Sequence, residues 1–245
     1  MVCQALEKGK HVFVEKPLAM NQEELQHVIQ TSNEHPNQCL MVGFNRRFSP
    51  HATSIKKWLA RTPGPLAMIL TVNAGAIPAD HWTQDIEVGG GRIVGEGCHF
   101  VDLARYFADS PICFADATPL AGGDGRMGDC AALQLAFENG SIATIHYLAN
   151  GSKDFPKERV EIFAGGHVFS CDNYRTSKII GGKDRFKTSS QDKGHKAELQ
   201  TFINAIKSGK SWPIPAEELF EVSRISIDLA QQVYSKLAKL TKGSQ

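Results

Sequence analysis

The sequence has no marked excess of either charge and no long apolar run. Lys and Arg together number 27 and Asp and Glu 26, which leaves a formal net charge of +1 over 245 residues. Nucleic acid and anionic membranes both bind concentrated basic surfaces, so neither is expected as a partner. No apolar stretch approaches the roughly 20 residues that cross a bilayer, and the first residues lack the basic and apolar regions of a signal peptide. We therefore expect a cytoplasmic protein.

Closely spaced cysteines are missing as well. The six cysteines are scattered, and no two have the spacing of a zinc site or a redox dithiol. An even number would allow disulfide bonds, but the size of the chain and the missing export signal favour reduced, buried thiols. The sequence thus predicts neither a metal site nor a disulfide framework.

Helix and strand patterns alternate in the first part of the chain. The apolar run 11–14 ends before Pro17 and is typical of a buried strand, and residues 39–44 repeat the pattern. Between them, Asn21 and Glu24 form a capping box ahead of an apolar helical stripe. This order predicts an α/β region, a parallel sheet covered by helices, over residues 1–48.

From about residue 49 the pattern changes to strands separated by turn dipeptides. Asn139-Gly140 lies between two strand-like segments, and both central positions of the expected turn favour positive φ. Gly165-Gly166 divides two further strands in the same way. Helical stripes return at the end of the chain, and the last is opened by Pro215. We expect a second domain of α+β class over residues 49–245, with antiparallel strands and flanking helices.

Two segments carry residue types suited to catalysis. Glu15-Lys16-Pro17 directly follows the first strand, and open α/β sheets bind ligands at the carboxyl ends of their strands. Pro17 favours extended backbone at Lys16, although Lys-Pro also occurs in plain surface turns. Five glycines between residues 89 and 97 precede His99 and permit close approach of the backbone to a ligand. A single histidine is more often structural, but this one follows a glycine-rich segment at the threshold of a helix.

Residues 5–19, 42–48 and 89–102 resemble, in this order, three signature segments of the Gfo/Idh/MocA oxidoreductases. The third segment is most similar to the subgroup that is fused behind a zinc-type alcohol dehydrogenase domain. The resemblance implies a Rossmann domain, followed by a domain whose large, open, mostly antiparallel sheet packs against another subunit in a homo-oligomer. It also implies NAD or NADP as cofactor, and a hydroxyl of a sugar, nucleotide sugar or cyclitol as the reacting group.

The same resemblance implies roles for individual side chains. The segment Glu15–Pro17 would contact the cofactor, with Lys16 beside the nicotinamide and the substrate hydroxyl. Asn45 and Arg46 would line the cofactor's end of the cleft, and His99 would be the general base. These residue types suit alcohol oxidation, because imidazole accepts a proton near neutral pH. An ammonium group stabilises the negative charge that develops on oxygen, while the cofactor carries the hydride chemistry.

The third segment departs from the family pattern at one position. The family carries Asp four residues before the histidine, where this chain has Gly95. Glu96 is adjacent, but one residue along a helix corresponds to about 100° of rotation. Glu96 can therefore replace that Asp as a catalytic residue only if the local backbone is not a regular α-helix. A solvated carboxylate is the alternative.

Three further residues are candidates for substrate binding. Trp82 precedes the glycine segment and could wall the pocket, or it could be a core tryptophan. Asp102 stands one helical turn after His99 and could orient the imidazole, or it could be a solvated carboxylate. His195 opens a late helix of a kind that reaches the active site in the family, although a plain surface position is favoured.

The chain does not open with the Gly-x-Gly-x-x-Gly motif or with the early strands that hold a cofactor pyrophosphate. Gly122-Gly123-Asp124-Gly125 has the context of a loop and is no substitute. We therefore expect a truncated Rossmann part, in a fragment or a naturally shortened protein. The predicted function is NAD(P)-dependent oxidation or reduction of a carbohydrate-like small molecule. Two alternatives stay open: an NAD-dependent glycoside hydrolase or lyase of the same fold, and a non-catalytic module that dimerises through its sheet.

Overall fold

The computed structural model describes residues 1–78, 80–84, 86–121, 129–209 and 212–242. Its N-terminal part is a two-stranded parallel sheet, β1 (Val12–Val14) with β2 (Leu40–Val42), covered by α1 (Val2–Glu7) and α2 (Gln22–Glu34). The Asn21 side chain accepts a hydrogen bond from the Glu24 backbone N–H, which confirms the predicted start of α2. The loop expected at residues 122–125 lies outside the described residues.

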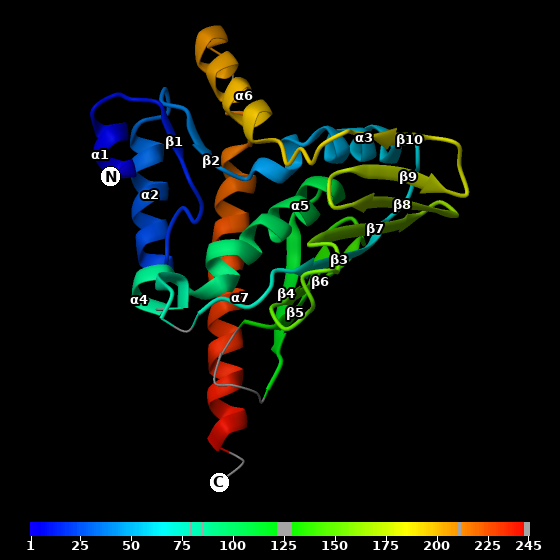
Figure 1. Cartoon of the computed structure of the whole chain (residues 1–245). Helices are drawn as coiled ribbons and strands as arrows, with labels where there is room; N and C mark the ends of the chain where they lie inside the picture. The colour runs from blue at the N-terminus through cyan, green and yellow to red at the C-terminus, as the bar shows by residue number, and fades with distance from the viewer. Residues whose placement is uncertain (79, 85, 122–128, 210–211, 243–245) are drawn as a thin grey trace.

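The larger sheet has eight strands in the order β10-β9-β8-β7-β3-β6-β5-β4. β3 and β6 are parallel, and the other neighbouring pairs are antiparallel. A small parallel sheet followed by a large, mostly antiparallel one confirms the predicted combination of α/β and α+β structure (Figure 1). The strands are β3 (Ala67–Asn73), β4 (Ile112–Pro119), β5 (Ala131–Phe137), β6 (Ile142–Leu148), β7 (Glu158–Ala164), β8 (His167–Asp172), β9 (Thr176–Ile180) and β10 (Arg185–Lys187).

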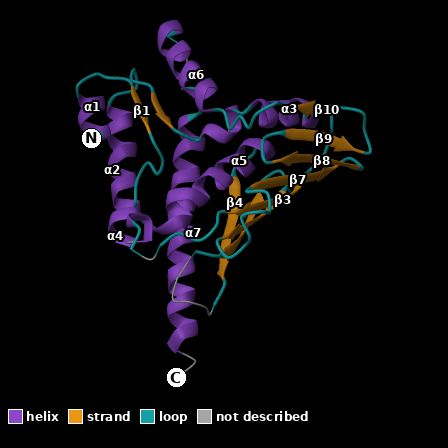
Figure 2. Cartoon of the chain, in the orientation of Figure 1, coloured by secondary structure: helices purple, strands orange, loops and turns teal. Residues whose placement is uncertain are grey.

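Helices α5 (Cys98–Ala108) and α7 (Ala216–Lys242) lie between the two sheets (Figure 2). α7 contacts α2 and β2 on the parallel side and α5 and β4 on the other. Leu70, Leu133 and Ile145 on the sheet are fully buried and share one hydrophobic core with Leu103 of α5 and Leu229 of α7. The predicted domain boundary stays a prediction. The remaining helices and turns are η1 (Asn45–Phe48), α3 (Pro50–Leu59), η2 (Trp82–Gln84), α4 (Ile86–Gly89), η3 (Ile93–Gly97) and α6 (His195–Ser208).

The two predicted hairpins differ in their turns. Gly165 and Gly166 both have positive φ, 53° and 76°, as expected for a two-residue turn between β7 and β8. At the β5–β6 hairpin Gly140 has a φ of 84° but Asn139 is not left-handed, so that part of the expectation is wrong. The Asn139 side chain instead donates to the Ala108 carbonyl and accepts from the Ser141 N–H. These bonds stabilise a wider turn and tie it to the end of α5.

Two further properties follow from the described residues. None of the helices among them is both long enough and apolar enough to span a membrane. All six cysteines are free thiols, and Cys39, Cys98 and Cys171 are buried.

Candidate active site

Lys16 joins the parallel sheet to the glycine-rich segment. It stands at the carboxyl end of β1, and its Nζ donates to the Gly95 carbonyl oxygen at 2.5 Å. The Lys16–Pro17 peptide bond is cis. An ammonium group has three N–H donors, so this bond leaves others for a ligand. The lysine is therefore placed at the sheet edge where the sequence predicts it.

The glycines of residues 89–97 allow close contact with protein side chains. Gly90 and Gly91 have φ of 67° and 75°, a region in which other residues are strained. A Cβ on Gly90 would press on the Met20 side chain, and one on Gly91 would collide with the hydroxyl of Tyr234 on α7. These two glycines thus allow the β1–α2 loop and α7 to pack closely against this segment. The expected close approach of the segment to a ligand stays a prediction.

His99 lies in the first turn of α5 and is 5 % exposed. Its Nδ1 is buried and has no hydrogen-bond partner among the described residues. Burial and the nearby cations Arg46, Lys16 and Lys193, together with His195, hold the pKa of His99 well below its ordinary value. The ring is consequently neutral at neutral pH and can accept a proton. Lys16 is bonded to Gly95, four residues before His99, and its charge acts on the His99 ring, so the two residues lie in the same region of the structure. Their catalytic roles stay predictions.

Asn45 and Arg46 lie beside His195, directly after β2. Nδ2 of Asn45 donates to the Lys193 carbonyl at 2.9 Å and lies 3.2 Å from Nε2 of His195. Arg46 binds Glu158 of β7 through Nε at 2.8 Å and Nη2 at 3.0 Å. The exposed His195 is thus a neighbour of the two residues predicted to line the cofactor's end.

Sequence reasoning missed Glu158 and Lys193. Nζ of Lys193 lies 2.5 Å from Oε1 of Glu158. Burial alone would raise the pKa of Glu158, but Arg46 and Lys193 outweigh it and hold that pKa below its ordinary value. A signal was present, because Glu158 occupies an inward position in phase with the buried Val160 and Ile162. A charged residue in such a position requires a partner.

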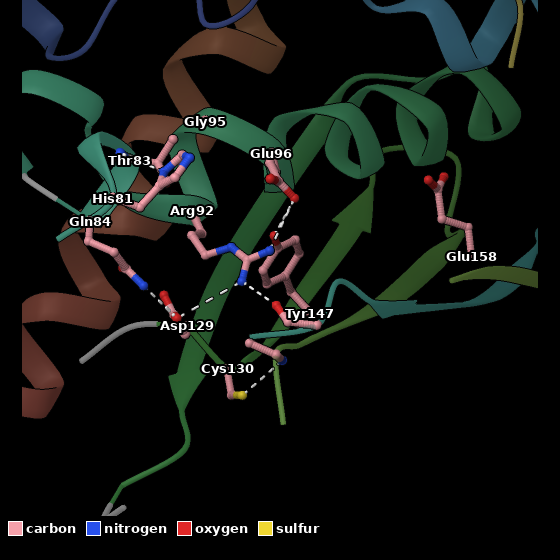
Figure 3. Close-up of polar contacts among 12 residues, drawn as sticks. His81, Thr83, Gln84, Arg92, Gly95, Glu96, Asp129, Cys130, Tyr147 and Glu158 are labelled. Carbon is pink, nitrogen blue, oxygen red and sulfur yellow. Dashed lines mark hydrogen bonds and ion pairs between the residues drawn. The ribbon is translucent and has the colours of Figure 1, made fainter. Parts of the chain in front are cut away.

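Glu96 points at the large sheet (Figure 3). The backbone of η3 is π-helical, with the Cys98 N–H bonded to the Ile93 carbonyl, so it does differ from a regular α-helix. The Tyr147 hydroxyl donates to Oε2 of Glu96 at 2.6 Å, and Nη2 of Arg92 lies 3.5 Å from the same oxygen. Gly95 offers Lys16 a carbonyl oxygen where the family has an Asp. The catalytic role of Glu96 stays a prediction.

Asp102 does not orient His99. Both of its oxygens bind Arg47, at 2.6 Å to Nη2 and 2.9 Å to Nε, and Arg47 also binds Glu218 at 2.7 Å. Asp102 is fully buried, so the alternative of a solvated carboxylate is wrong as well. Its side chain is committed to the core between α5 and α7, away from the imidazole.

Trp82 is 60 % exposed, which excludes the alternative of a core tryptophan. It lies in η2, with its ring centroid 5.9 Å from that of His81. Its predicted part in substrate binding stays a prediction.

A cavity of about 570 Å³ lies beside Glu158, because its lining includes Lys157, which precedes Glu158, and Asn173, whose N–H donates to the Glu158 carbonyl. It is lined by residues 73–76 after β3, residues 153–157 and Asn173. Arg92 reaches its rim, because Nη1 donates to the Gly75 carbonyl at 2.7 Å. This volume lies within the range of small-molecule sites.

Two family models match this chain. One, described as the Gfo/Idh/MocA oxidoreductase family with an NAD-binding Rossmann fold, matches residues 1–44. The other, the Gfo/Idh/MocA C-terminal domain, matches residues 62–164. Together they span more than half of the chain, in the order that the resemblance predicts.

Curated relatives and solved structures agree with these matches. The chain is 27 % identical over 229 residues to myo-inositol 2-dehydrogenase of Thermotoga maritima, covering 85 % of this chain and 66 % of the relative. It is 32 % identical over 214 residues to inositol 2-dehydrogenase 2 of Saccharopolyspora erythraea, covering 82 % and 61 %. The chain therefore spans about two thirds of the length of these relatives.

The fold is shared with levoglucosan dehydrogenase, whose structure in complex with NADH and levoglucosan gives a TM-score of 0.80 at 18 % identity. That comparison covers 96 % of this chain and 74 % of the other. With both family models matched in order and the fold in common, the chain belongs to the Gfo/Idh/MocA family of oxidoreductases.

Proposed function

We propose that the chain carries the catalytic residues of an NAD(P)-dependent enzyme that interconverts a hydroxyl and a carbonyl of a sugar, nucleotide sugar or cyclitol. The observation that carries this proposal is the hydrogen bond from Lys16, after β1, to Gly95, which stands four residues before His99. The His99 ring is neutral, and its buried Nδ1 has no hydrogen-bond partner among the described residues. The relatives named as inositol dehydrogenases support a cyclitol or a similar polyhydroxylated substrate.

In the oxidation direction, the His99 ring takes the proton of the reacting hydroxyl. Its lowered pKa keeps the ring neutral, so that an unprotonated ring nitrogen is present to receive the proton. The ammonium of Lys16 donates to the same oxygen and stabilises the negative charge that develops there. Lys16 can bind the substrate while it keeps its bond to Gly95, because that bond uses one of its three N–H groups.

The residues around Lys16 fit the nicotinamide end of NAD or NADP. β1 and β2 are parallel, so Glu15–Pro17 after β1 and Asn45 and Arg46 after β2 meet at one edge of the sheet. This edge is the usual ligand-binding edge of open parallel sheets. When bound there, the cofactor supplies the acceptor or donor of the hydride.

The test is turnover of the intact protein with NAD(P), using myo-inositol and levoglucosan as the first substrates. Lys16→Ala is expected to lower kcat/KM by about 100-fold, because it removes one donor to the developing oxyanion. Lys10→Ala, at an exposed lysine, is the matched control and should be silent. Full turnover by Lys16→Ala would refute the role of Lys16.

Two other outcomes would replace the proposal. Release of a free aglycone without net NADH would indicate glycoside cleavage. Binding of NAD(P)H can be monitored by nicotinamide fluorescence. If no binding is detected at millimolar concentration, the chain is a non-catalytic module.

We further propose that the outer face of the large sheet binds a second copy of the chain. Strand register aligns one apolar side chain from each of seven strands into a continuous row on this face. Several members are large and exposed, among them Phe114 at 54 % and Ile142 at 55 %. Exposed apolar patches of this kind are typical of protein interfaces. The row is Ile180, Val168, Phe163, Ala67, Ile142, Ala136 and Phe114.

Sedimentation of the intact protein tests this second proposal. Ile142→Lys places a charge in the middle of the apolar row and is expected to shift the oligomer to monomer. Lys178→Gln changes an exposed residue in the neighbouring row and serves as control. A wild-type monomer, or an oligomer that withstands Ile142→Lys, would contradict the assignment.

A further inference from the structure

Glu96 is held by the protein through one carboxylate oxygen (Figure 3). Tyr147 of β6 donates to Oε2 at 2.6 Å, and Arg92 approaches the same atom at 3.5 Å. Oε1 accepts no hydrogen bond from the residues that the structure describes. Because the Glu96 side chain is 35 % exposed, this second oxygen is open to a ligand.

The two residues that hold Glu96 are themselves fixed. Tyr147 is fully buried, and Arg92 is 2 % exposed with its guanidinium 5.3 Å from the centroid of the Tyr147 ring. Nη1 of Arg92 is bound to Gly75 and lies 4.0 Å from Oδ2 of Asp129. The hydroxyl of this buried tyrosine donates to Glu96, a bond that a phenylalanine at position 147 would lack. Fixed neighbours of this kind keep a ligand-binding side chain, here Glu96, in a single geometry.

Glu96 does not line the cavity of about 570 Å³ but is linked to it through neighbouring residues. Two observations connect them: Arg92 binds both Glu96 and the cavity-lining Gly75, and the charge of the cavity-lining Lys157 acts on Glu96. Hydroxyl groups donate strong, charge-assisted hydrogen bonds to carboxylates. A fixed carboxylate with one free oxygen, linked to this cavity, is therefore suited to a polyhydroxylated ligand.

Glu96 is suited to binding rather than to accepting a proton. Burial would raise its pKa, but the Tyr147 hydrogen bond and the charges of Arg92, Lys157 and Lys16 outweigh burial and lower it. The carboxylate thus stays ionised through the neutral range, and its free oxygen can accept hydrogen bonds from a ligand. Asp129 also faces Arg92 and balances part of its charge.

We propose that Tyr147 and Arg92 are positioning residues that hold Glu96 as a substrate-binding carboxylate, whose free oxygen accepts a hydrogen bond from a second, non-reacting hydroxyl of the substrate. This inference rests on the proposed function and names a determinant of its substrate. Lys16, which is bound to the residue before Glu96, contacts the reacting hydroxyl. The spacing between Lys16 and Glu96 then selects substrates with a second hydroxyl at the matching position.

A double-mutant cycle in the intact protein tests the proposal. Tyr147→Phe and Glu96→Ala are each expected to raise KM for the better of myo-inositol and levoglucosan by about 10-fold or more. kcat should change by less than about 3-fold, since the lost interaction is binding common to ground and transition state. Tyr147→Phe should add little in the Glu96→Ala background, because Tyr147 acts through Glu96. Tyr106→Phe removes a hydroxyl that makes no hydrogen bond to a described residue and is the matched control.

Three results would overturn the proposal. They are an unchanged KM in Tyr147→Phe, additive losses in the double variant, and a fall in kcat at constant KM, which would place Glu96 in the chemical step. If the wild type turns over neither substrate, the proposed function fails for these two substrates. A carboxyl-carbon NMR titration of Glu96 still tests whether Tyr147 positions its carboxylate. Tyr147→Phe should move the Glu96 titration to higher pH, and an unmoved titration would show that Tyr147 does not position it.

Discussion

Arg46 and Arg47 are adjacent in the sequence and lie in the same turn, η1, yet they serve different parts of the molecule. Arg47 is 5 % exposed and joins α5 to α7 through Asp102 and Glu218. Arg46 reaches Glu158 on β7 and contributes to the field at His99. Both arginines are well paired, but the Arg47 cluster lies in the core between α5 and α7, whereas the charge of Arg46 acts on His99, whose buried Nδ1 has no partner among the described residues. The unpartnered nitrogen of His99, rather than the pairing of the arginines, marks the candidate site.

The largest expected effect is on the unfolding free energy, when the cluster of Arg47, Asp102 and Glu218 is broken. Arg47→Met leaves Asp102 and Glu218 without their cation, and Asp102 is fully buried. Removing one partner of a buried ion pair costs about 3–5 kcal/mol of unfolding free energy. Denaturant unfolding at neutral pH measures this cost.

Arg159→Met is the matched control for Arg47→Met. Arg159 pairs with Glu161 at 2.8 Å but is 48 % exposed, so its loss should cost less than about 1 kcal/mol. Equal losses in the two variants would show that the Arg47 cluster does not stabilise the fold more than a surface pair.

Glu198 is a buried carboxyl that, unlike Asp102 and Glu158, forms no ion pair with any arginine that the structure describes. It is 2 % exposed, its Oε2 has no hydrogen-bond partner among the described residues, and burial with the nearby Glu15 raises its pKa to about 8. A raised folded-state pKa gives stability that is complete below the ordinary value of 4.5 and is lost as the pH rises through about 8. Glu198→Gln should remove a decline of about 2 kcal/mol or more between these pH values.

Unfolding experiments at both ends of that pH range compare wild type with Glu198→Gln. Glu7→Gln, an exposed carboxyl on α1, is the control and should keep the wild-type pH dependence. The assignment fails if Glu198→Gln declines between the two pH values as steeply as the wild type.

The sequence predicted the features that depend on local pattern. The strand before Lys16, the capping box at Asn21 and the placement of Lys16 at the edge of the sheet follow from periodicity and strand polarity. The partners of Glu158 and Glu96 come from segments that are distant in the sequence, so the local sequence pattern cannot predict which residues pair with them. Asp102 shows most clearly what local pattern cannot predict. It stands one helical turn after His99, which suggested a contact with the imidazole, but its side chain binds Arg47. Which face of a helix meets which charge is set by the tertiary fold.

The smallest expected effect is at His99 itself. After burial, the charge of Arg46 is the largest cause that lowers the pKa of His99, ahead of Lys16, Lys193 and His195. Arg46→Gln should therefore raise that pKa, while burial keeps it below the ordinary value. Proton NMR of the His99 ring against pH measures the shift, and Arg159→Gln, at an exposed arginine paired with Glu161, is the control. In a turnover assay, the acid limb that reports His99 should move to higher pH in Arg46→Gln, because a less suppressed imidazole protonates earlier. A ring titration that stays in place or moves to lower pH would separate Arg46 from the site and leave both arginines as structural residues.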